Sequence, residues 1–331
     1  MFLKFFIIYL FTGGGTGLIG RSLTSSLRAA GHKVQIITRN PKDANDLSWV
    51  SFFYKYNMHF SQNSIKQFGL PENIHVVVNL SGRNIGEINP SLLIKQNYDK
   101  FIEELFSSRL DTTRILVEAS KSAPLKAFIN ASAIGFYAPD LEATYDESAA
   151  YKDCGLITSL VKQWEEAAQI HSRPDIRQIQ LRTGVVLSKD SHFIRSIYLS
   201  HRLGFCNAIG SGRQWISWIH LGDLTRIIEY VADSKVSFSS GPVNCTAPEP
   251  TQQAILAKAV SESLGAPFNP LGRIPTPPSV FRLLLGPDRV TLVQDGQRVI
   301  PTKLINSGFK FNYPTLADAL ENIFGRRPSC V

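Results

Sequence analysis

Short apolar runs alternate with helical patterns along the first two-thirds of the chain. An apolar run over residues 2–11 leads into a glycine-rich stretch, and apolar positions spaced for one helix face follow from Leu18 to Leu27. Gly31 then suits a helix C-terminus, because glycine readily adopts the left-handed conformation that ends many helices. Residues 33–38 read as a second strand. This order of strand, glycine loop, helix and strand is typical of the start of a parallel α/β sheet.

The same alternation resumes after residues 41–73, a polar stretch whose aromatic cluster from Trp49 to Tyr56 is compatible with a short strand. Residues 75–80 contain a continuous apolar run, as expected of a central strand buried on both faces. The further expected elements are a long helix over 92–122, a strand over 127–131, a helix over 156–171 and a strand over 179–182. Together they predict the α/β class, with a Rossmann-type doubly wound parallel sheet and a small C-terminal α/β lobe.

The pattern loosens from about residue 188, where Gly, Trp and Pro become more frequent, and prolines concentrate in residues 267–278. A proline-rich segment is a semi-rigid boundary. We therefore expect an NAD(P)-binding domain over residues 1–240, with substrate-lobe segments from about 188. A substrate-side domain over 241–331 would follow it, with a compact subdomain at about 273–324.

Composition and charge narrow the class of protein. The chain has 331 residues, is 44% hydrophobic and 19% charged, and carries a formal charge of +8. These values are ordinary for a globular protein, and the positive charge favours anionic partners. Because the basic residues are scattered singly, without interleaved aromatics, we expect a phosphorylated cofactor and no nucleic acid. The four cysteines are far apart, so neither a metal site nor a disulfide framework is expected.

The apolar N-terminal run resembles a signal peptide, but two features speak against that interpretation. No small-residue cleavage site follows residues 2–11, and cleavage there would remove the strand that leads into the glycine loop. No apolar stretch is long enough to span a bilayer, so we expect no membrane insertion. We therefore expect the protein to be intracellular. The cytoplasm is the default location, and a mitochondrial location is the alternative. The oligomeric state is not indicated.

The glycine loop between the first strand and the first helix carries the clearest chemistry. Gly14, Gly17 and Gly20 are spaced G-x-x-G-x-x-G in the context that a dinucleotide requires. Without side chains, the loop turns tightly and lets backbone N–H groups and the helix N-terminus approach a pyrophosphate. A glycine-rich turn without a ligand is the alternative.

The residues after the second strand indicate which of the two nicotinamide cofactors, NAD(H) or NADP(H), the chain binds. An acidic residue there would hydrogen-bond the adenosine ribose of NAD, but the chain has Thr38-Arg39-Asn40. A guanidinium clamps a 2′-phosphate, which a carboxylate would repel. The sequence therefore predicts NADP(H), unless Arg39 is simply a surface arginine.

The chain resembles the extended short-chain dehydrogenases/reductases and, more narrowly, the epimerase family proteins of SDR family 39U. The segments that carry the resemblance are Gly13–Gly20, Asn79–Gly82, Ser108–Thr113, Ser132–Tyr137, Trp164–Ala168, Arg182–Leu187, Gly210–Trp215, Trp218–His220, Gly241–Asn244 and Gly296–Pro301. The C-terminal part is similar to a domain of unknown function typical of this subgroup. Residues 41–73 match least.

The resemblance implies contacts with NADP(H) at several strand ends and on the helix that follows the fourth strand. Together with the glycine loop, the expected cofactor-binding residues are Gly14, Thr16, Gly17, Leu18, Ile19, Gly20, Thr38, Arg39, Leu80, Ser81, Glu104, Arg109 and Val186. From the residues alone, Glu104 and Arg109 could equally form a solvated helix face.

The catalytic pair of active family members is incomplete. Such enzymes use a Tyr-x-x-x-Lys pair in which the lysine lowers the pKa of the tyrosine, which acts as acid and base. None of the ten tyrosines here has a lysine four residues later. The family pattern puts Thr158 at the tyrosine position, with Lys162 four residues on, and Ala133 at the serine position, next to Ser132. Tyr137, Lys162, Ser132 and His220 remain as proton-donor candidates; water as the donor, or cofactor binding without turnover, are the alternatives.

Candidates for the substrate side lie in the segments Gly212–Trp215 and Trp218–His220. Arg213 could hold an anionic or phosphorylated substrate, and Trp215 could stack on a ring. The alternative is that the tryptophans pack between lobes and that His220 caps a local hydrogen bond. Asp223 is expected to begin a helix as its N-cap.

Two functions from different classes follow. The first is an NADP(H)-dependent oxidoreductase or epimerase-like enzyme that acts on an unidentified small molecule. The second is a catalytically weak or inactive NADPH-binding regulatory or scaffold protein, which the missing Tyr-x-x-x-Lys pair favours. A nucleotide-sugar enzyme that uses NAD conflicts with Arg39.

Overall fold

The computed structural model describes residues 8–12, 14–38, 47–48, 70, 73–87, 90–202, 208–265 and 296–331. None of the helices found in these ranges is long and apolar enough to cross a bilayer.

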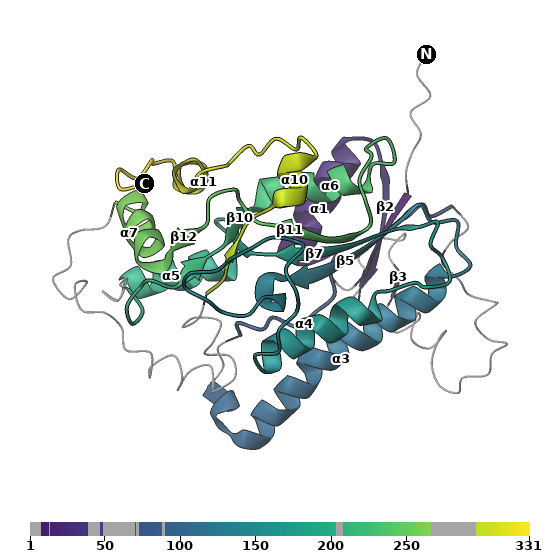
Figure 1. Cartoon of the computed structure of the whole chain (residues 1–331), viewed down its shortest axis with the longest axis horizontal. Helices are drawn as coiled ribbons and strands as arrows, with labels where there is room; N and C mark the ends of the chain where they lie inside the picture. Colours follow the sequence, from purple (N-terminus) through teal and green to yellow (C-terminus); the bar gives the residue numbers. More distant parts are fainter. Residues whose placement is uncertain are drawn as a thin grey trace, which may run out of the picture.

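A seven-stranded parallel sheet forms the centre of the molecule (Figure 1). Its strands are β1 (Ile8–Thr12), β2 (Lys33–Thr38), β3 (Leu47–Ser48), β4 (Val76–Asn79), β5 (Ala127–Ala133), β7 (Arg177–Thr183) and β11 (Gly241–Cys245). Their order is β11-β7-β5-β4-β1-β2-β3, and every pair is parallel. The chain therefore winds outward in both directions from β1 and β4, which confirms the doubly wound α/β fold.

Helices cover both faces of this sheet. In Figure 1, α1 (Leu18–Ala29) and α6 (Leu221–Ala232) lie on one face, and α3 (Lys95–Ser120) and α4 (Leu156–Ala167) on the other. The side chains of β4 alternate between the two: Val76 and Val78 pack into the core beneath α1 and α6, whereas Val77 packs beneath α3. A strand buried on both faces explains the continuous apolar run of the sequence.

Shorter elements extend the carboxyl side of the sheet. They are the 3-10 turns η2 (Pro90–Leu93) and η3 (Ile134–Phe136), strands β6 (Thr144–Tyr145), β8 (Val185–Leu187), β9 (Trp215–Ile216), β10 (Trp218–His220), β12 (Thr251–Gln252) and β13 (Arg298–Val299), and helices α5 (His192–Arg202), α7 (Gln253–Ser263), α10 (Thr302–Asn306) and α11 (Leu316–Phe324). Strand β8 pairs with β10, β9 with β12, and β6 with β13. The last pair joins residues far apart in the sequence, and α11 packs with α7 and α5 in one core cluster.

Most of the expected elements are present, with shifted ends. The helix expected over 92–122 begins only at Lys95, after the 3-10 turn at Pro90–Leu93. Residues 2–7 of the first strand, the cluster Trp49–Tyr56 and the boundary 267–278 lie outside the described residues. The division into two domains stays a prediction.

Candidate functional site

The glycine loop packs against the end of β4 and against its own helix. A Cβ atom on Gly14 would lie 2.3 Å from the carbonyl oxygen of Leu80, and one on Gly20 would lie 2.0 Å from the carbonyl oxygen of Gly14. Any side chain at either position would displace backbone. The helix begins after Gly17 with no side-chain cap and no acidic residue in its first turn. Its first N–H groups are therefore available to an anion.

The end of β4 is held by one buried asparagine. Asn79 Nδ2 donates to Thr113 Oγ1 at 2.8 Å and to Asn130 Oδ1 at 2.7 Å, while its Oδ1 accepts the Ser81 N–H at 3.1 Å. This fixes Leu80 and Ser81 where β4 leaves the sheet, beside the glycine loop. Ligands of open α/β sheets bind at such carboxyl ends.

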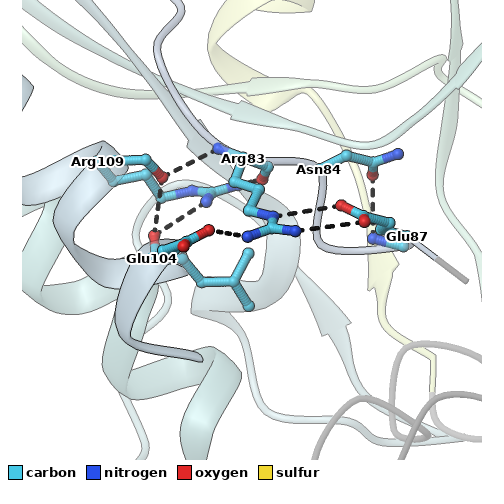
Figure 2. Close-up of polar contacts among 8 residues, drawn as sticks. Arg83, Asn84, Glu87, Glu104 and Arg109 are labelled. Carbon is cyan, nitrogen blue, oxygen red and sulfur yellow. Dashed lines mark hydrogen bonds and ion pairs between the residues drawn. The ribbon is translucent and has the colours of Figure 1, made fainter. Parts of the chain in front are cut away.

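A cluster of charges lines the loop that follows Ser81 (Figure 2). The Arg83 guanidinium lies between two carboxylates: its Nε donates to Glu87 at 3.2 Å, and its Nη1 bonds Glu104. The Arg109 guanidinium donates to the carbonyl oxygens of Arg83 at 2.9 Å and Leu105 at 3.1 Å. Burial lowers the pKa of Arg109 to about 10. Glu104 and Arg109 thus both contact this loop, Arg109 from a buried position and Glu104 with a side chain that is 42% exposed.

The remaining expected cofactor residues are distributed around the same edge of the sheet. Ile19, Leu80 and Val186, from α1, the end of β4 and β8, all pack against the core cluster that α1 and α6 cover. Thr38 is buried at the end of β2, and Thr16 is exposed in the glycine loop. Arg39 lies outside the described residues.

Ser132 and Tyr137 are buried in a polar network below this edge. Ser132 Oγ donates to Glu165 Oε1 at 2.6 Å, and the Arg182 guanidinium donates to both oxygens of Glu165 at 2.8 Å. Tyr137 Oη donates to Asn244 Oδ1 at 2.7 Å and accepts from Arg182 at 2.9 Å. Tyr137 is 0% exposed, and burial raises its pKa, which Arg182 offsets only in part. Both hydroxyls are engaged inside the protein.

Thr158 and Lys162 differ in how far solvent reaches them. Thr158 is 3% exposed, and its hydroxyl accepts the Cys154 N–H at 2.9 Å and bonds Asp153 Oδ1 at 3.2 Å. It therefore secures the start of α4. The Lys162 side chain is 40% exposed, and its Nζ lies 2.9 Å from Glu166 Oε1.

Two of the substrate-side candidates lie at the surface near β9. Trp215 Nε1 donates to the carbonyl oxygen of Leu141 at 2.8 Å, and the Arg298 guanidinium covers its ring at 4.6 Å. The Arg213 side chain is 66% exposed, and its nearest carboxylate is that of Glu142, at 3.9 Å. Both arginines are exposed, and the Arg298 guanidinium lies over this indole ring.

His220 and Asp223 fasten the start of α6 to the C-terminal segment. The prediction that Asp223 is the N-cap was wrong: His220 holds that position, and its Nδ1 accepts the Gly222 N–H at 3.1 Å. Asp223 lies inside the first turn, 0% exposed, where it accepts the N–H groups of Asn312 and Tyr313. His220 is 7% exposed, and its ring packs on that of Tyr313, so the local capping role is the one that the structure describes.

Sequence reasoning missed Glu165, Arg182 and Arg83. Arg182 lies near the end of β7, directly after the apolar Leu181, and a buried arginine requires an acidic partner. That signal predicts a carboxylate nearby but does not identify Glu165. Arg83 directly follows the glycine at the end of a central strand, which places it at the ligand edge, but the sequence gives no sign that two carboxylates hold it there.

Comparisons with known proteins agree with this geometry. Residues 11–245 match the model of the NAD dependent epimerase/dehydratase family, and residues 276–323 match a domain of unknown function, DUF1731. The chain is 34% identical to the mouse epimerase family protein SDR39U1, over 94% of this chain and 98% of that one. It is 32% identical to an epimerase family protein of Staphylococcus aureus, over 95% and 98%. It is also similar to the crystal structure of human SDR39U1 (isoform2) with NADPH, with a TM-score of 0.82, 32% identity, and 96% and 99% of the two chains covered.

Proposed function

The chain belongs to the NAD dependent epimerase/dehydratase family and, within it, to the epimerase family proteins related to SDR39U1, and we propose that it binds NADP(H) and uses it on a small-molecule substrate. The reaction class is that of an oxidoreductase or epimerase. The human relative was crystallised with NADPH, which supports the choice of the phosphorylated cofactor.

The observation that carries the proposal is the absence of side chains between the glycine loop and the end of β4. Gly14 and Gly20 have no room for a Cβ atom, while the N-terminus of α1 has no side chain of its own over its free N–H groups. Such a cradle fits a pyrophosphate, because backbone N–H groups and the helix dipole both favour an anion there.

The residues on this edge fit the rest of the cofactor. The resemblance implies cofactor contacts at Thr38 and Arg39, the Arg39 guanidinium would clamp the ribose 2′-phosphate, and Leu80 and Ser81 would lie beside the bound nucleotide. The Glu104 and Arg109 cluster would support that loop from behind. NADPH would supply a hydride to an electrophilic carbon of the substrate, and Lys162, whose ammonium reaches solvent at this edge, would favour negative charge developing nearby.

A second function is favoured by the state of the family's usual catalytic positions. Ala133, which has no hydroxyl, occupies the serine position, and the neighbouring Ser132 and Thr158, at the tyrosine position, are buried and hydrogen-bonded inside the protein. A protein that binds NADPH without turning it over, and that changes its affinity for another molecule in response, would have the same glycine loop and the same buried hydroxyls.

Cofactor choice is tested by titrating the protein with NADPH and NADH while following nicotinamide fluorescence. We expect tighter binding of NADPH, and loss of this preference in Arg39→Asp. Arg195→Asp, whose native side chain is 67% exposed on α5, is the charge-matched control and should keep the preference. Equal binding of the two cofactors by the unmodified protein would refute the choice of NADP(H).

Turnover is tested by incubating the NADPH-loaded protein with a metabolite extract and following the absorbance of the reduced nicotinamide. Consumption above the protein-free rate supports the enzyme. No consumption, with NADPH binding intact, favours the regulatory alternative.

We also propose an intracellular setting, with the cytoplasm as the default. Cys154, Cys245 and Cys330 are free thiols, and Cys154 is exposed. Unpaired cysteines are typical of reducing compartments. Fractionation of the cells that make the protein would test this.

A further inference from the structure

A cavity lies at the amino ends of three strands, at the edge of the sheet opposite to that of the glycine loop. Its volume is about 300 Å³, and its lining includes Lys126, Arg177 and Ser240, which stand at or directly before the first residues of β5, β7 and β11. These strands are neighbours in the sheet (Figure 1). Because β5 and β7 are seven residues long, roughly 20 Å of strand separate the cavity from the cofactor edge. Pockets for small molecules have volumes of about 300–1,000 Å³.

The charge around this cavity is positive on balance. The Arg177 guanidinium donates to the carbonyl oxygens of Val231, Asp233 and Val236 at 2.9, 2.8 and 2.6 Å. The carbonyl dipoles at the end of α6 offset only part of its charge. Lys126 is exposed, and no carboxylate of the described residues pairs with its ammonium. Two cations therefore belong to the lining without an anionic partner.

The carboxylate in the lining is already neutralised. Asp175 accepts from Arg173 Nε at 2.9 Å and from Arg173 Nη2 at 2.8 Å, and these bonds hold the pKa of Asp175 below its usual range. The carboxylate of Asp233 accepts the Lys235 N–H at 2.8 Å, and Asp233 is not part of the lining. The cavity therefore favours a ligand with negative charge.

The other lining residues suit a small apolar body that carries such a charge. Ile176, Ala232 and Phe238 are 1%, 3% and 9% exposed, so this part of the lining is continuous with the core. Ser240 adds a hydroxyl whose oxygen accepts the Gln178 N–H at 3.1 Å, which leaves its proton for a ligand oxygen. Binding pockets combine mostly apolar walls with a few polar groups in this way.

We propose that this cavity binds a small organic monoanion, a carboxylate on a flat apolar body, and that it does so whether or not the cofactor site is occupied. Lys126 pairs with the carboxylate, the charge of Arg177 attracts it, and Phe238 contacts the apolar body. A single charge fits, because Arg177 already uses three donors on the end of α6. The site is separate from the proposed function, since no residue of the glycine loop or of β4 lines it.

The first test titrates the protein into 4-fluorobenzoate and follows the broadening of the ¹⁹F line of this probe, with and without saturating NADPH. We expect a dissociation constant of about 1–10 mM that NADPH leaves unchanged. The uncharged 4-fluorobenzamide, of nearly the same shape, should bind about 2–5-fold more weakly. Displacement of the probe by NADPH, or equal binding of the amide, overturns the proposal. A protein that binds the probe but no NADPH would refute the proposed function alone.

The second test moves the affinity for 4-fluorobenzoate in opposite directions from one cavity. Lys126→Met should weaken binding about 2–5-fold, and Asp175→Asn, which releases the charge of Arg173, should strengthen it by a similar factor. Lys258→Met, on α7 with a side chain that is 67% exposed, is the control and should change nothing. Thermal melting checks that each variant is folded, and a purely structural role would not give effects of opposite sign. Equal affinities in Lys126→Met and Lys258→Met, or no gain in Asp175→Asn, overturn the proposal.

Discussion

Arg182 on β7 and Glu165 on α4 form a buried bidentate ion pair. Nε donates to Oε1 and Nη2 to Oε2, both at 2.8 Å, and the two side chains are 4% and 11% exposed. The guanidinium also stacks 3.4 Å from the ring centre of Phe136. The pair joins a helix to a strand directly below the ligand edge, so the geometry of the site depends on it.

Glu165→Gln should lower the free energy of unfolding by about 3–5 kcal/mol, because it leaves the Arg182 charge buried without a counter-charge. Urea unfolding measures this change. Glu166→Gln, on the exposed side of the same helix, is the control and should cost less than about 1 kcal/mol. Similar losses in the two variants would contradict the buried pair.

Gly14→Ala should weaken NADPH binding and lower the free energy of unfolding by about 1–3 kcal/mol, because the added Cβ meets the Leu80 carbonyl oxygen. Fluorescence titration and urea unfolding measure the two effects. In the neighbouring loop, a Cβ on Gly86 would make only an ordinary contact, 3.6 Å from Asn84 Oδ1. Gly86→Ala should therefore leave the NADPH affinity and the free energy of unfolding unchanged. If Gly86→Ala lowered both as much as Gly14→Ala does, the steric explanation for Gly14 would be contradicted.

Asp223→Asn should loosen the segment that crosses the start of α6. The native carboxylate accepts the N–H groups of Asn312 at 2.9 Å and Tyr313 at 2.8 Å, and the amide keeps only one acceptor oxygen. We expect a loss of about 1.5–3 kcal/mol and faster hydrogen exchange at these two amides. Asp233→Asn, at the other end of α6, should leave their exchange rates unchanged.

His220 should make stability depend on pH below neutrality. Burial lowers its pKa, although Asp223 and Asn322 oppose this, whereas histidine in an unfolded chain titrates near about 6.5. The unfolded chain therefore takes up the proton first, so stability is fully present above about pH 6.5 and is lost as the pH falls through the folded pKa. The free energies of unfolding of wild type and His220→Asn, measured from pH 8 to pH 5, should converge toward acid. Parallel curves would speak against a neutral, buried His220.

The sequence predicted the elements of the fold correctly where the local pattern of apolar residues matches the side chains that the structure buries. The valines of β4 and the periodic leucines of α1 identify their elements without help from distant residues. The prediction that Asp223 is an N-cap was wrong because a carboxylate near the start of a helix usually caps it. Here the backbone N–H groups of residues 312 and 313, which are distant in sequence, donate to the carboxylate oxygens instead. Ser132 and Tyr137 were chosen by position along the chain, which carries no information on whether a hydroxyl is already bonded.

The pairing of β6 with β13 has a consequence for synthesis of the chain. Arg298 and Val299 complete a ladder with Thr144 and Tyr145. A ribosome that adds about 5–20 residues per second needs roughly 10–30 s to travel between these strands. In the later part of that interval, once β7 and β11 have been made, the nascent chain has all the strands of its central sheet but still lacks the strand that pairs with β6. Recognition of the emerging protein by chaperones should therefore be strongest after β6 has left the ribosome and before β13 has.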